Sequence, residues 1–169
     1  YQAANALVSA GLVLATGGDA AQVFDAMARL QPVRGRLERA AISRSGAPVY
    51  VDYAHTPDAL EKVLKALKAV AQARGGELIC VVGCGGNRDP GKRPQMAQVS
   101  VEYATYSIFT SDNPRYEDPQ QILQQMLAGV ASTRNVQTVP DRRQAIYMAV
   151  RQAREQDVIL LAGKGHERS

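Results

Sequence analysis

Residues 77–110 read ELICVVGCGGNRDPGKRPQMAQVSVEYATYSIFT, and this stretch decides the fold. It begins with a short apolar run at residues 77–82 and ends with another at residues 106–110, both of a length typical of buried strands. A Gly-rich loop and a segment that favours a helix over residues 95–103 lie between them. A strand, a loop, a helix and a second strand in this order predict a βαβ unit with parallel strands.

The same alternation continues on both sides of this unit. We predict strands at residues 47–51, 136–139 and 157–162, and helices at residues 58–73, 119–130 and from the cap Asp141 to about residue 155. On the first of these helices one face is apolar, and it consists of Leu60, Val63, Leu64, Leu67 and Val70. From about residue 36 we therefore expect an α/β fold with a doubly wound, mainly parallel, Rossmann-like sheet.

The first thirty residues have a different pattern. Residues 4–14 are rich in Ala, Leu and Val, and Gly17-Gly18 interrupts that run. Asp19 is expected to cap a second helix that reaches about residue 30 and is stopped by Pro32. We therefore divide the chain into a helical segment at residues 1–32 and an α/β domain at residues 33–169.

The composition is that of a soluble globular protein, with 46% hydrophobic and 21% charged residues among 169. No apolar run approaches the roughly 20 residues that a membrane helix needs. The first residues lack the basic region of a signal peptide and an initiator Met, so we expect the chain to begin inside a longer protein.

The charges and cysteines exclude two further classes. The net charge of +4 comes from 20 basic and 16 acidic residues that are scattered along the chain, which argues against a nucleic-acid-binding surface. Cys80 and Cys84 are the only cysteines, and two thiols cannot complete a zinc site. We expect both to be reduced, and we expect no bound metal.

Polar sequences follow the predicted strands at four places. They are residues 52–57, 83–89, 112–115 and 163–167. In an open parallel sheet the loops after the strands share the carboxyl edge, where ligands bind. The four loops are therefore expected to form one site.

The loop Asp112-Asn113-Pro114-Arg115 offers both signs of charge at one point. Pro114 fixes its own φ and restricts Asn113, which stiffens the loop. Arg115 can present a planar fork of donors to a carboxylate. Such a loop suits a zwitterionic ligand such as an amino acid, although an ordinary turn in which Asp or Asn caps the next helix also explains it.

The loop at residues 83–93 carries four glycines together with Arg88, Lys92 and Arg93. Backbone N–H groups of glycines can approach an anion closely, and a helix that starts near Pro94 adds a favourable dipole. The loop matches neither the Walker A sequence nor the dinucleotide fingerprint. It predicts an anion site, with a plain flexible loop as the alternative.

The two remaining loops offer further polar contacts. Asp52 is expected to accept hydrogen bonds from ribose, and His55 to contact a phosphate or base, unless Asp52 and Thr56 only cap the next helix. Glu167 is expected to bind an ammonium group, unless its loop is simply solvated. No Ser/His/Asp or Cys/His arrangement is recognisable, so we assign no catalytic residue.

These segments together resemble the carboxy-terminal domain of the Mur ligases, and within that family the branch that adds diaminopimelate. The matching segments are Tyr50–Glu61 (YVDYAHTPDALE), residues 83–94, Asp112–Arg115 and Gly163–Glu167 (GKGHE), and they occur in the family's order. The resemblance covers about residues 33–167. It extends upstream through Asn5-Ala6-Leu7 and Gly35–Glu38 to the end of the family's central ATPase domain.

The resemblance implies an ATP-dependent amide ligase of bacterial peptidoglycan synthesis that works in the cytoplasm on UDP-MurNAc-L-Ala-D-Glu. In this family ATP converts the D-glutamyl carboxylate into an acyl phosphate. The amino group of meso-diaminopimelate then attacks it, and ADP and phosphate are released.

The resemblance also implies roles for individual residues. It assigns the binding of meso-diaminopimelate to Arg88, Asp112, Asn113, Pro114, Arg115, Gly163 and Glu167. It places Arg36, Asp52 and His55 on the ATP side and gives this chain no metal ligand. Diaminopimelate has a carboxylate that lysine lacks, so a buried Arg115 that lysine leaves unpaired would discriminate between the two amino acids.

The family's P-loop, magnesium ligands and modified lysine belong to its central domain and are absent from this sequence. We therefore expect the chain to fold but not to catalyse alone, because ATP and magnesium must be positioned elsewhere. Residues 4–30 would lose their packing partner and rearrange or self-associate, whereas the full-length protein is expected to be a monomer. The final Arg168-Ser169 does not match the continuation expected from the family.

Two other functions remain open. The chain could be a stand-alone module that binds an anionic ligand, which an upstream P-loop would exclude. It could also come from a relative of folylpolyglutamate or cyanophycin synthetase. Those enzymes select other acceptors, so this alternative is disfavoured by the segments Asp112–Arg115 and Gly163–Glu167.

Overall fold

The computed structural model describes residues 2–30 and 33–165, and the chain forms two compact units, Tyr1–Val33 and Arg34–Ser169. Pro32, Glu167, Arg168 and Ser169, for which the sequence made predictions, lie outside the described residues.

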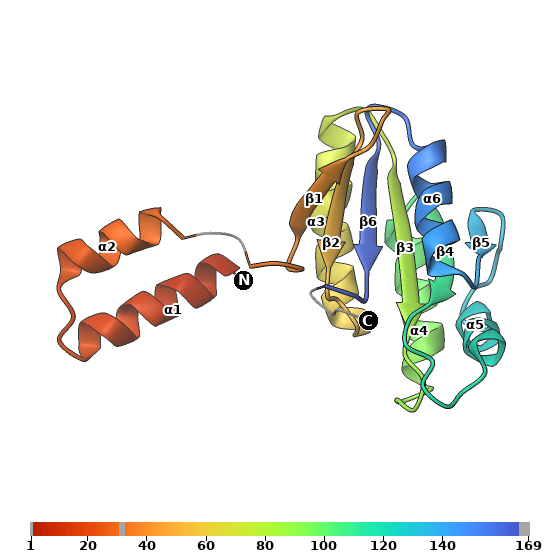
Figure 1. Ribbon diagram of the computed structural model, residues 1–169, viewed down its shortest axis with the longest axis horizontal. Helices are drawn as coiled ribbons and strands as arrows, with labels where there is room; N and C mark the ends of the chain where they lie inside the picture. Colours follow the sequence, from red (N-terminus) through yellow and green to blue (C-terminus); the bar gives the residue numbers. More distant parts are fainter. Residues whose placement is uncertain (1, 31–32, 166–169) are drawn as a thin grey trace. The chain divides into compact units, whose positions relative to one another are not determined.

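The first unit is a pair of helices, α1 (Gln2–Ala15) and α2 (Ala20–Ala28), drawn in red and orange in Figure 1. The side chain of Asp19 caps α2 by accepting a hydrogen bond from the backbone N–H of Gln22. Leu7, Leu12 and Phe24 are each about 60% exposed, at 64%, 64% and 60%. The predicted helices are confirmed, and their origin in a central domain and their self-association remain predictions.

The second unit contains a six-stranded sheet with the order β1-β2-β6-β3-β4-β5 (Figure 1). Its strands are β1 (Glu38–Ile42), β2 (Pro48–Asp52), β3 (Leu78–Cys84), β4 (Tyr106–Ser111), β5 (Val136–Thr138) and β6 (Val158–Ala162). All neighbouring pairs are parallel except β1 and β2. The predicted mainly parallel α/β fold is confirmed.

The sequence analysis missed β1. This strand lies at the edge of the sheet, and four of its five residues are exposed, so it lacks the apolar run that reveals a buried strand. A turn that includes Gly46, whose φ is 97°, joins it to β2.

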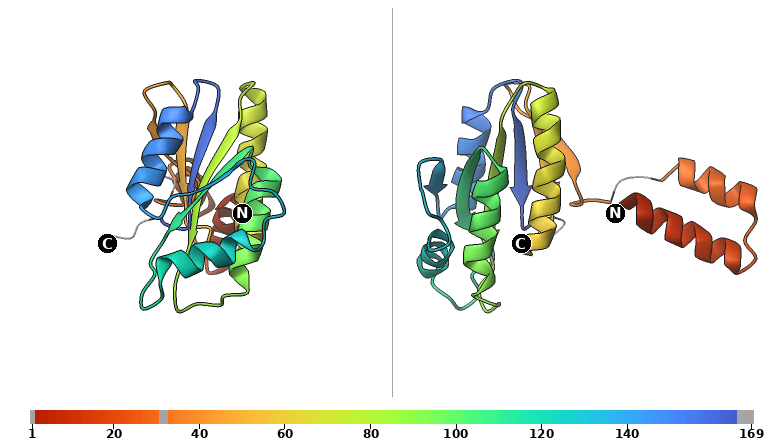
Figure 2. Two further views of the ribbon diagram at one scale, coloured as in Figure 1. Left: turned by 90° about the vertical axis from the view of Figure 1, so that its right-hand side faces the viewer. Right: turned by 180° about the vertical axis from the view of Figure 1, so that it is seen from behind.

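Helices cover both faces of the sheet. Their bounds are α3 (Pro57–Ala73), α4 (Lys92–Tyr103), α5 (Pro119–Leu127) and α6 (Arg142–Gln152). The chain moves across the sheet in one direction through α3, α4 and α5, and α6 returns it to β6 between β2 and β3. Because such crossovers are right-handed, the return helix lies on the opposite face, as Figure 2 shows for α6 against α3 and α4.

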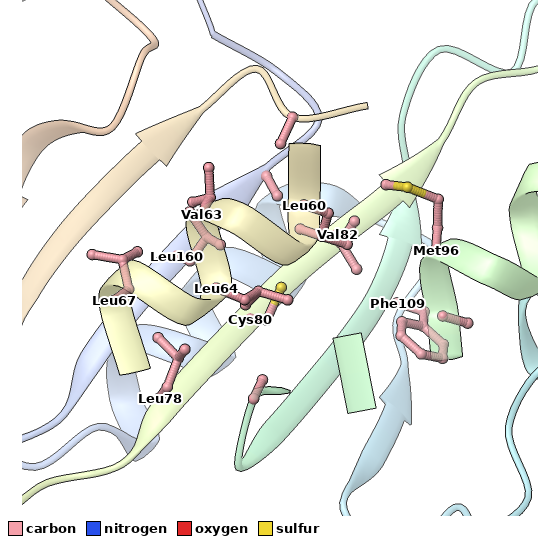
Figure 3. Packing of buried hydrophobic residues seen from close by; sticks show 14 of the residues in the cluster. Leu60, Val63, Leu64, Leu67, Leu78, Cys80, Val82, Met96, Phe109 and Leu160 are labelled. Carbon is pink, nitrogen blue, oxygen red and sulfur yellow. The ribbon is translucent and has the colours of Figure 1, made fainter. Parts of the chain in front are cut away.

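The larger hydrophobic core lies between α3, α4, α5 and the sheet. Leu60 and Leu64 of α3 pack near Cys80 and Val82 of β3 (Figure 3), and all four are fully buried. A buried leucine side chain of this kind contributes about 2 kcal/mol to folding. Val70, which we predicted on this face, is 37% exposed, because Ala71 rather than Val70 continues the buried stripe at helical spacing.

The helix caps follow the sequence closely. Thr56 caps α3 with Pro57 in the first turn, and Asp141 caps α6 by accepting from the backbone N–H of Gln144. In the described part of the chain, no helix combines the length and the apolar character that a bilayer crossing requires.

Candidate functional site

The four polar loops meet at one edge of the sheet. They follow β2, β6, β3 and β4, which are consecutive neighbours and mutually parallel. Their carboxyl ends therefore lie side by side, as the sequence analysis predicted.

A pocket of about 300 Å³ lies between these loops. All four loops contribute to its lining, which consists of Tyr53, His55, Gly83, Cys84, Gly85, Arg88, Asp89, Lys92, Arg93, Met96, Asp112, Asn113, Arg115 and Gly163. Six predicted site residues are among them, namely His55, Arg88, Asp112, Asn113, Arg115 and Gly163. Arg36, Asp52 and Pro114 are not in the lining.

Asp112 lies at the end of β4, and its side chain is 15% exposed. Its Oδ1 atom is 3.9 Å from Nζ of Lys164, which belongs to the loop after β6. Gly163 has a φ of 92°, and a Cβ there would lie 3.3 Å from the carbonyl oxygen of Gly83. The glycine thus lets the end of β6 approach both β3 and the Asp112 carboxylate.

Arg115 adopts a left-handed backbone conformation with a φ of 51°. Its Nη1 atom donates to the carbonyl oxygen of Gly86 at 2.6 Å, so the guanidinium lies against the glycine loop. Arg115 as a whole residue is exposed, whereas the hydrogen bond of its guanidinium to Gly86 is partly buried, so the burial of the guanidinium around a bound amino acid stays a prediction. A non-glycine residue in this conformation costs about 1–2 kcal/mol and points to a functional constraint.

The amino-terminal end of α4 faces the same pocket. Lys92 and Met96 of this helix line the pocket, and the exposed Arg88 lies in the loop before it. Gly91 precedes the helix and makes no side-chain cap. Asp89, which also lines the pocket, accepts from the Gly91 N–H at 2.9 Å and partly offsets the helix dipole and the two cations, so the anion site stays a prediction.

Arg93 differs from its basic neighbours. Its side chain is only 2% exposed, and its guanidinium donates to both carboxylate oxygens of Glu117, at 2.8 and 2.9 Å. We grouped Arg93 with Arg88 and Lys92 as an anion ligand, but this arginine is engaged by a carboxylate of its own chain. No sequence signal links the two residues, which are 24 positions apart.

Cys84 also lines the pocket, and burial raises the pKa of its thiol to about 12. The thiol is therefore protonated near neutral pH and is a poor nucleophile.

On the side of β2, three side chains contact one another, and the rings of Tyr53 and His55 are tilted by 57°. The Cζ atom of Arg36 is 5.0 Å from the ring centroid of Tyr53, and the rings of Tyr53 and His55 are 4.8 Å apart. Nδ1 of His55 is 3.0 Å from the carbonyl oxygen of Tyr53. Tyr53 and His55 line the pocket, and Arg36 reaches it only through its contact with Tyr53. The role of Arg36 and His55 on the ATP side stays a prediction.

Asp52 has a structural role. Its side chain is 2% exposed, and its two oxygens accept from the backbone N–H groups of Leu37 at 2.7 Å and Ala54 at 2.8 Å. Leu37 has a φ of 50°, so the carboxylate supports a strained turn. Contact between Asp52 and a ribose, which the sequence analysis predicted, has no support in this geometry and stays a prediction.

The substitution Asp52→Ala is expected to lower the free energy of unfolding by about 2–4 kcal/mol, because two backbone N–H groups lose a charged acceptor. Urea denaturation of the chain measures this change. Asp58→Ala is the control, since Asp58 is exposed and pairs with Lys62 on the surface of α3, and it should cost under about 1 kcal/mol. Equal effects of the two substitutions would contradict the structural role.

The chain is similar to known proteins along nearly its whole length. Residues 35–165 match the family model described as Mur ligase, glutamate ligase domain. The UDP-N-acetylmuramoyl-L-alanyl-D-glutamate–2,6-diaminopimelate ligase of Zymomonas mobilis is 49% identical over 167 residues, which are 99% of this chain and 33% of that protein. The chain thus spans about a third of the length of this curated relative.

Solved structures show the same likeness. A structure of a UDP-N-acetylmuramoyl-L-alanyl-D-glutamate–2,6-diaminopimelate ligase matches with a TM-score of 0.70 and 40% identity, covering 95% of this chain and 32% of that one. A folylpolyglutamate synthase from Thermotoga maritima matches with a TM-score of 0.62 and 19% identity, covering 87% and 34% of the two chains. The second likeness shows the fold alone.

Proposed function

The chain belongs to the Mur ligase family, and from this we propose that it is the amino-acid-recognising, carboxy-terminal domain of an ATP-dependent amide ligase. The ligase adds meso-diaminopimelate to UDP-MurNAc-L-Ala-D-Glu in bacterial peptidoglycan synthesis and works in the cytoplasm. The similarity to diaminopimelate ligases over 99% of the chain supports this choice of acceptor.

The observation that carries the proposal is the mixed charge of the pocket at the carboxyl edge. Arg88, Arg115 and Lys92 bring positive charge to it, and Asp89 and Asp112 bring negative charge. A zwitterionic amino acid presents carboxylate and ammonium groups together and matches this arrangement. In the proposal, Arg115 and Arg88 bind carboxylates of diaminopimelate, and Asp112 and Asn113 receive an ammonium group.

Further predicted contacts complete the pocket. Pro114 holds the loop between Asn113 and Arg115, and Gly163 allows the close approach of β6. Glu167, which lies outside the described residues, is proposed to bind a second ammonium group. These contacts rest on the resemblance to the family and on the residues' positions around the pocket.

The chemistry of the ligase requires a free amine at this site. The amine nitrogen attacks the carbonyl carbon of the acyl phosphate, a C–N bond forms, and the C–O bond to phosphate breaks. The phosphate leaves with the electron pair of the broken C–O bond. The nitrogen attacks as the neutral amine, becomes positively charged as the C–N bond forms, and then loses a proton to solvent or phosphate. The domain contributes by orienting the amine toward the acyl group, which lowers the entropic part of the barrier.

ATP and magnesium are proposed for the full-length protein. The resemblance to the family places the magnesium ligands outside this chain, and this domain is therefore proposed to contribute none. We propose that Arg36 and His55 contact ATP from this domain, and that the chain without the remaining two thirds of its relatives' length does not catalyse.

The proposal predicts the acceptor of the full-length protein. Incubated with ATP, magnesium and UDP-MurNAc-L-Ala-D-Glu, it should ligate meso-diaminopimelate at least about a hundredfold more efficiently than L-lysine, because lysine leaves an arginine of the pocket without a carboxylate. Phosphate release and the mass of the product measure the reaction. The isolated chain should show no turnover.

Two outcomes would contradict the proposal. Equal use of lysine and diaminopimelate would remove the assigned acceptor. Ligation of glutamate to a folate instead would favour the folylpolyglutamate synthetases, and the absence of an upstream P-loop in the full-length protein would favour a stand-alone binding module.

A further inference from the structure

Besides the hydrogen bond from the Arg115 guanidinium to Gly86, a second set of hydrogen bonds, which involves no proposed ligand-binding side chain, holds the loop after β3 to the loop after β4. The backbone N–H of Gly86 donates to the carbonyl oxygen of Asn113 at 2.8 Å. The backbone N–H of Tyr116 donates to Oδ1 of Asn87 at 3.1 Å. The two loops therefore form one joined structure at the pocket edge.

The Arg93–Glu117 ion pair lies at the centre of this structure. Besides Arg93, the Glu117 carboxylate accepts a hydrogen bond from the backbone N–H of Asn87. Arg93 also donates to the side-chain oxygen of Gln125 on α5 and to the carbonyl oxygen of Gly85 at 3.3 Å. One buried guanidinium thus connects α4, α5, the glycine loop and the loop after β4.

The Arg93–Glu117 ion pair stays charged and intact at neutral pH. The hydrogen bond from Arg93, and then that from Asn87, hold the pKa of Glu117 below its ordinary value of 4.5. The carboxylate is therefore charged at neutral pH, and the pair is lost only as the pH falls through this lowered value. A guanidinium that is 2% exposed cannot lose its partner without leaving a buried charge uncompensated.

Two strained residues lie on opposite sides of the connection. Asn87 and Arg115 both have left-handed backbones, with φ values of 50° and 51°. Asn tolerates this conformation, but Arg does so only when its surroundings impose it. Residues on both sides of Arg115 are bonded to the glycine loop or to Arg93, and these bonds hold its backbone in the left-handed conformation. Asn113 is bonded before it, and Tyr116 and Glu117 are bonded after it.

We propose that the Arg93–Glu117 pair positions Arg115 and Asn113 for the acceptor amino acid by fixing the loop after β4 against the glycine loop. The pair does not touch the ligand in this role, and it acts through the backbone of both loops. This inference rests on the proposed function, because it concerns the binding of meso-diaminopimelate by the same pocket.

The test compares Glu117→Gln with Glu61→Gln in the full-length protein. Glu61 is the matched control, since it forms an ion pair with Lys65 on the surface of α3 and does not line the pocket. Glu117→Gln should raise KM for meso-diaminopimelate about tenfold, because a displaced loop misplaces the groups that bind it. KM for ATP and for UDP-MurNAc-L-Ala-D-Glu should change by less than about twofold, and Glu61→Gln should change none of the three.

Hydrogen exchange provides a second readout that needs no ligand. The backbone N–H groups of Gly86, Asn87 and Tyr116 cross between the loops, so their exchange should become at least about tenfold faster in Glu117→Gln. The N–H of Leu60 in α3, which bonds to Thr56, should be unaffected and reports on global stability.

Each result decides the inference. Unchanged exchange at all three N–H groups would overturn the connection itself. Faster exchange with an unchanged KM for meso-diaminopimelate, or an equal rise in KM for all three substrates, would overturn the positioning role. If the wild-type protein fails to ligate diaminopimelate, the proposed function and the positioning role fall together, and the exchange measurement still shows whether the pair joins the loops.

Discussion

Arg115→Ala is expected to lower kcat/KM for meso-diaminopimelate by about ten- to a hundredfold in the full-length protein, and to remove most of the preference over lysine. A hydrogen-bonded charge of this kind contributes about 1.5–3 kcal/mol. Arg115 as a whole residue is exposed, so water can partly replace the ligand's carboxylate there, and the effect should stay below that of a fully buried arginine. Lysine has no second carboxylate, so its use should change little.

The backbone conformation makes this substitution a clean test. Arg and Ala are both disfavoured at a φ of 51°, so the change removes the guanidinium without relieving the strain. Arg134→Ala serves as the control, because Arg134 is exposed in the loop before β5 and does not line the pocket. Steady-state phosphate release with each amino acid measures the effect. If the variant kept the wild-type preference, Arg115 would not be the specificity residue.

Gly86→Ala is expected to lower kcat/KM for meso-diaminopimelate by about a hundredfold, because it separates the two loops of the pocket. A Cβ at Gly86 would lie 1.9 Å from the carbonyl oxygen of Pro114, a backbone atom that cannot move independently. The loop that carries Asn113 and Arg115 must therefore shift. The free energy of unfolding should fall by about 1–3 kcal/mol, as for an overpacked site.

Gly91→Ala in the same loop is the control for this effect. A Cβ there would lie 3.2 Å from Oδ1 of Asp89, which accepts from the Gly91 N–H, and a shift of this side chain by a few tenths of an ångström makes room. Kinetics with meso-diaminopimelate and urea denaturation compare the two variants. Near-normal kinetics for Gly86→Ala would show that the close contact between the loops is not required for acceptor binding.

Much of the fold follows from local patterns. The apolar runs of β3, β4 and β6 and the caps Asp19, Thr56 and Asp141 are found where they were predicted. Each depends on residues that are neighbours in the sequence. The edge strand β1 escaped prediction because its exposed residues carry no such pattern.

The place of the pocket in the fold could also be predicted from local patterns, but not all of its internal contacts could. Four polar loops after four strands indicated one site, and the sheet brings them together because those strands are parallel neighbours. The internal pairing of Arg93 was not predicted, since the choice of a partner depends on packing. The family resemblance, not periodicity, suggested the acceptor.

Local sequence patterns were enough to predict the helices, every strand except the edge strand β1, the capping residues and the common edge of the polar loops. These features depend on the spacing of apolar residues and on the chemistry of adjacent residues. Only the tertiary structure decided that β6, the last strand in the chain, lies between β2 and β3, and that Arg93 pairs with Glu117 rather than with a ligand. The position of β6 and the partner of Arg93 both depend on contacts between residues that are far apart in the sequence. The free energy of burying a strand or a charge is set by the groups that surround it in the fold, and local sequence patterns do not reveal those groups.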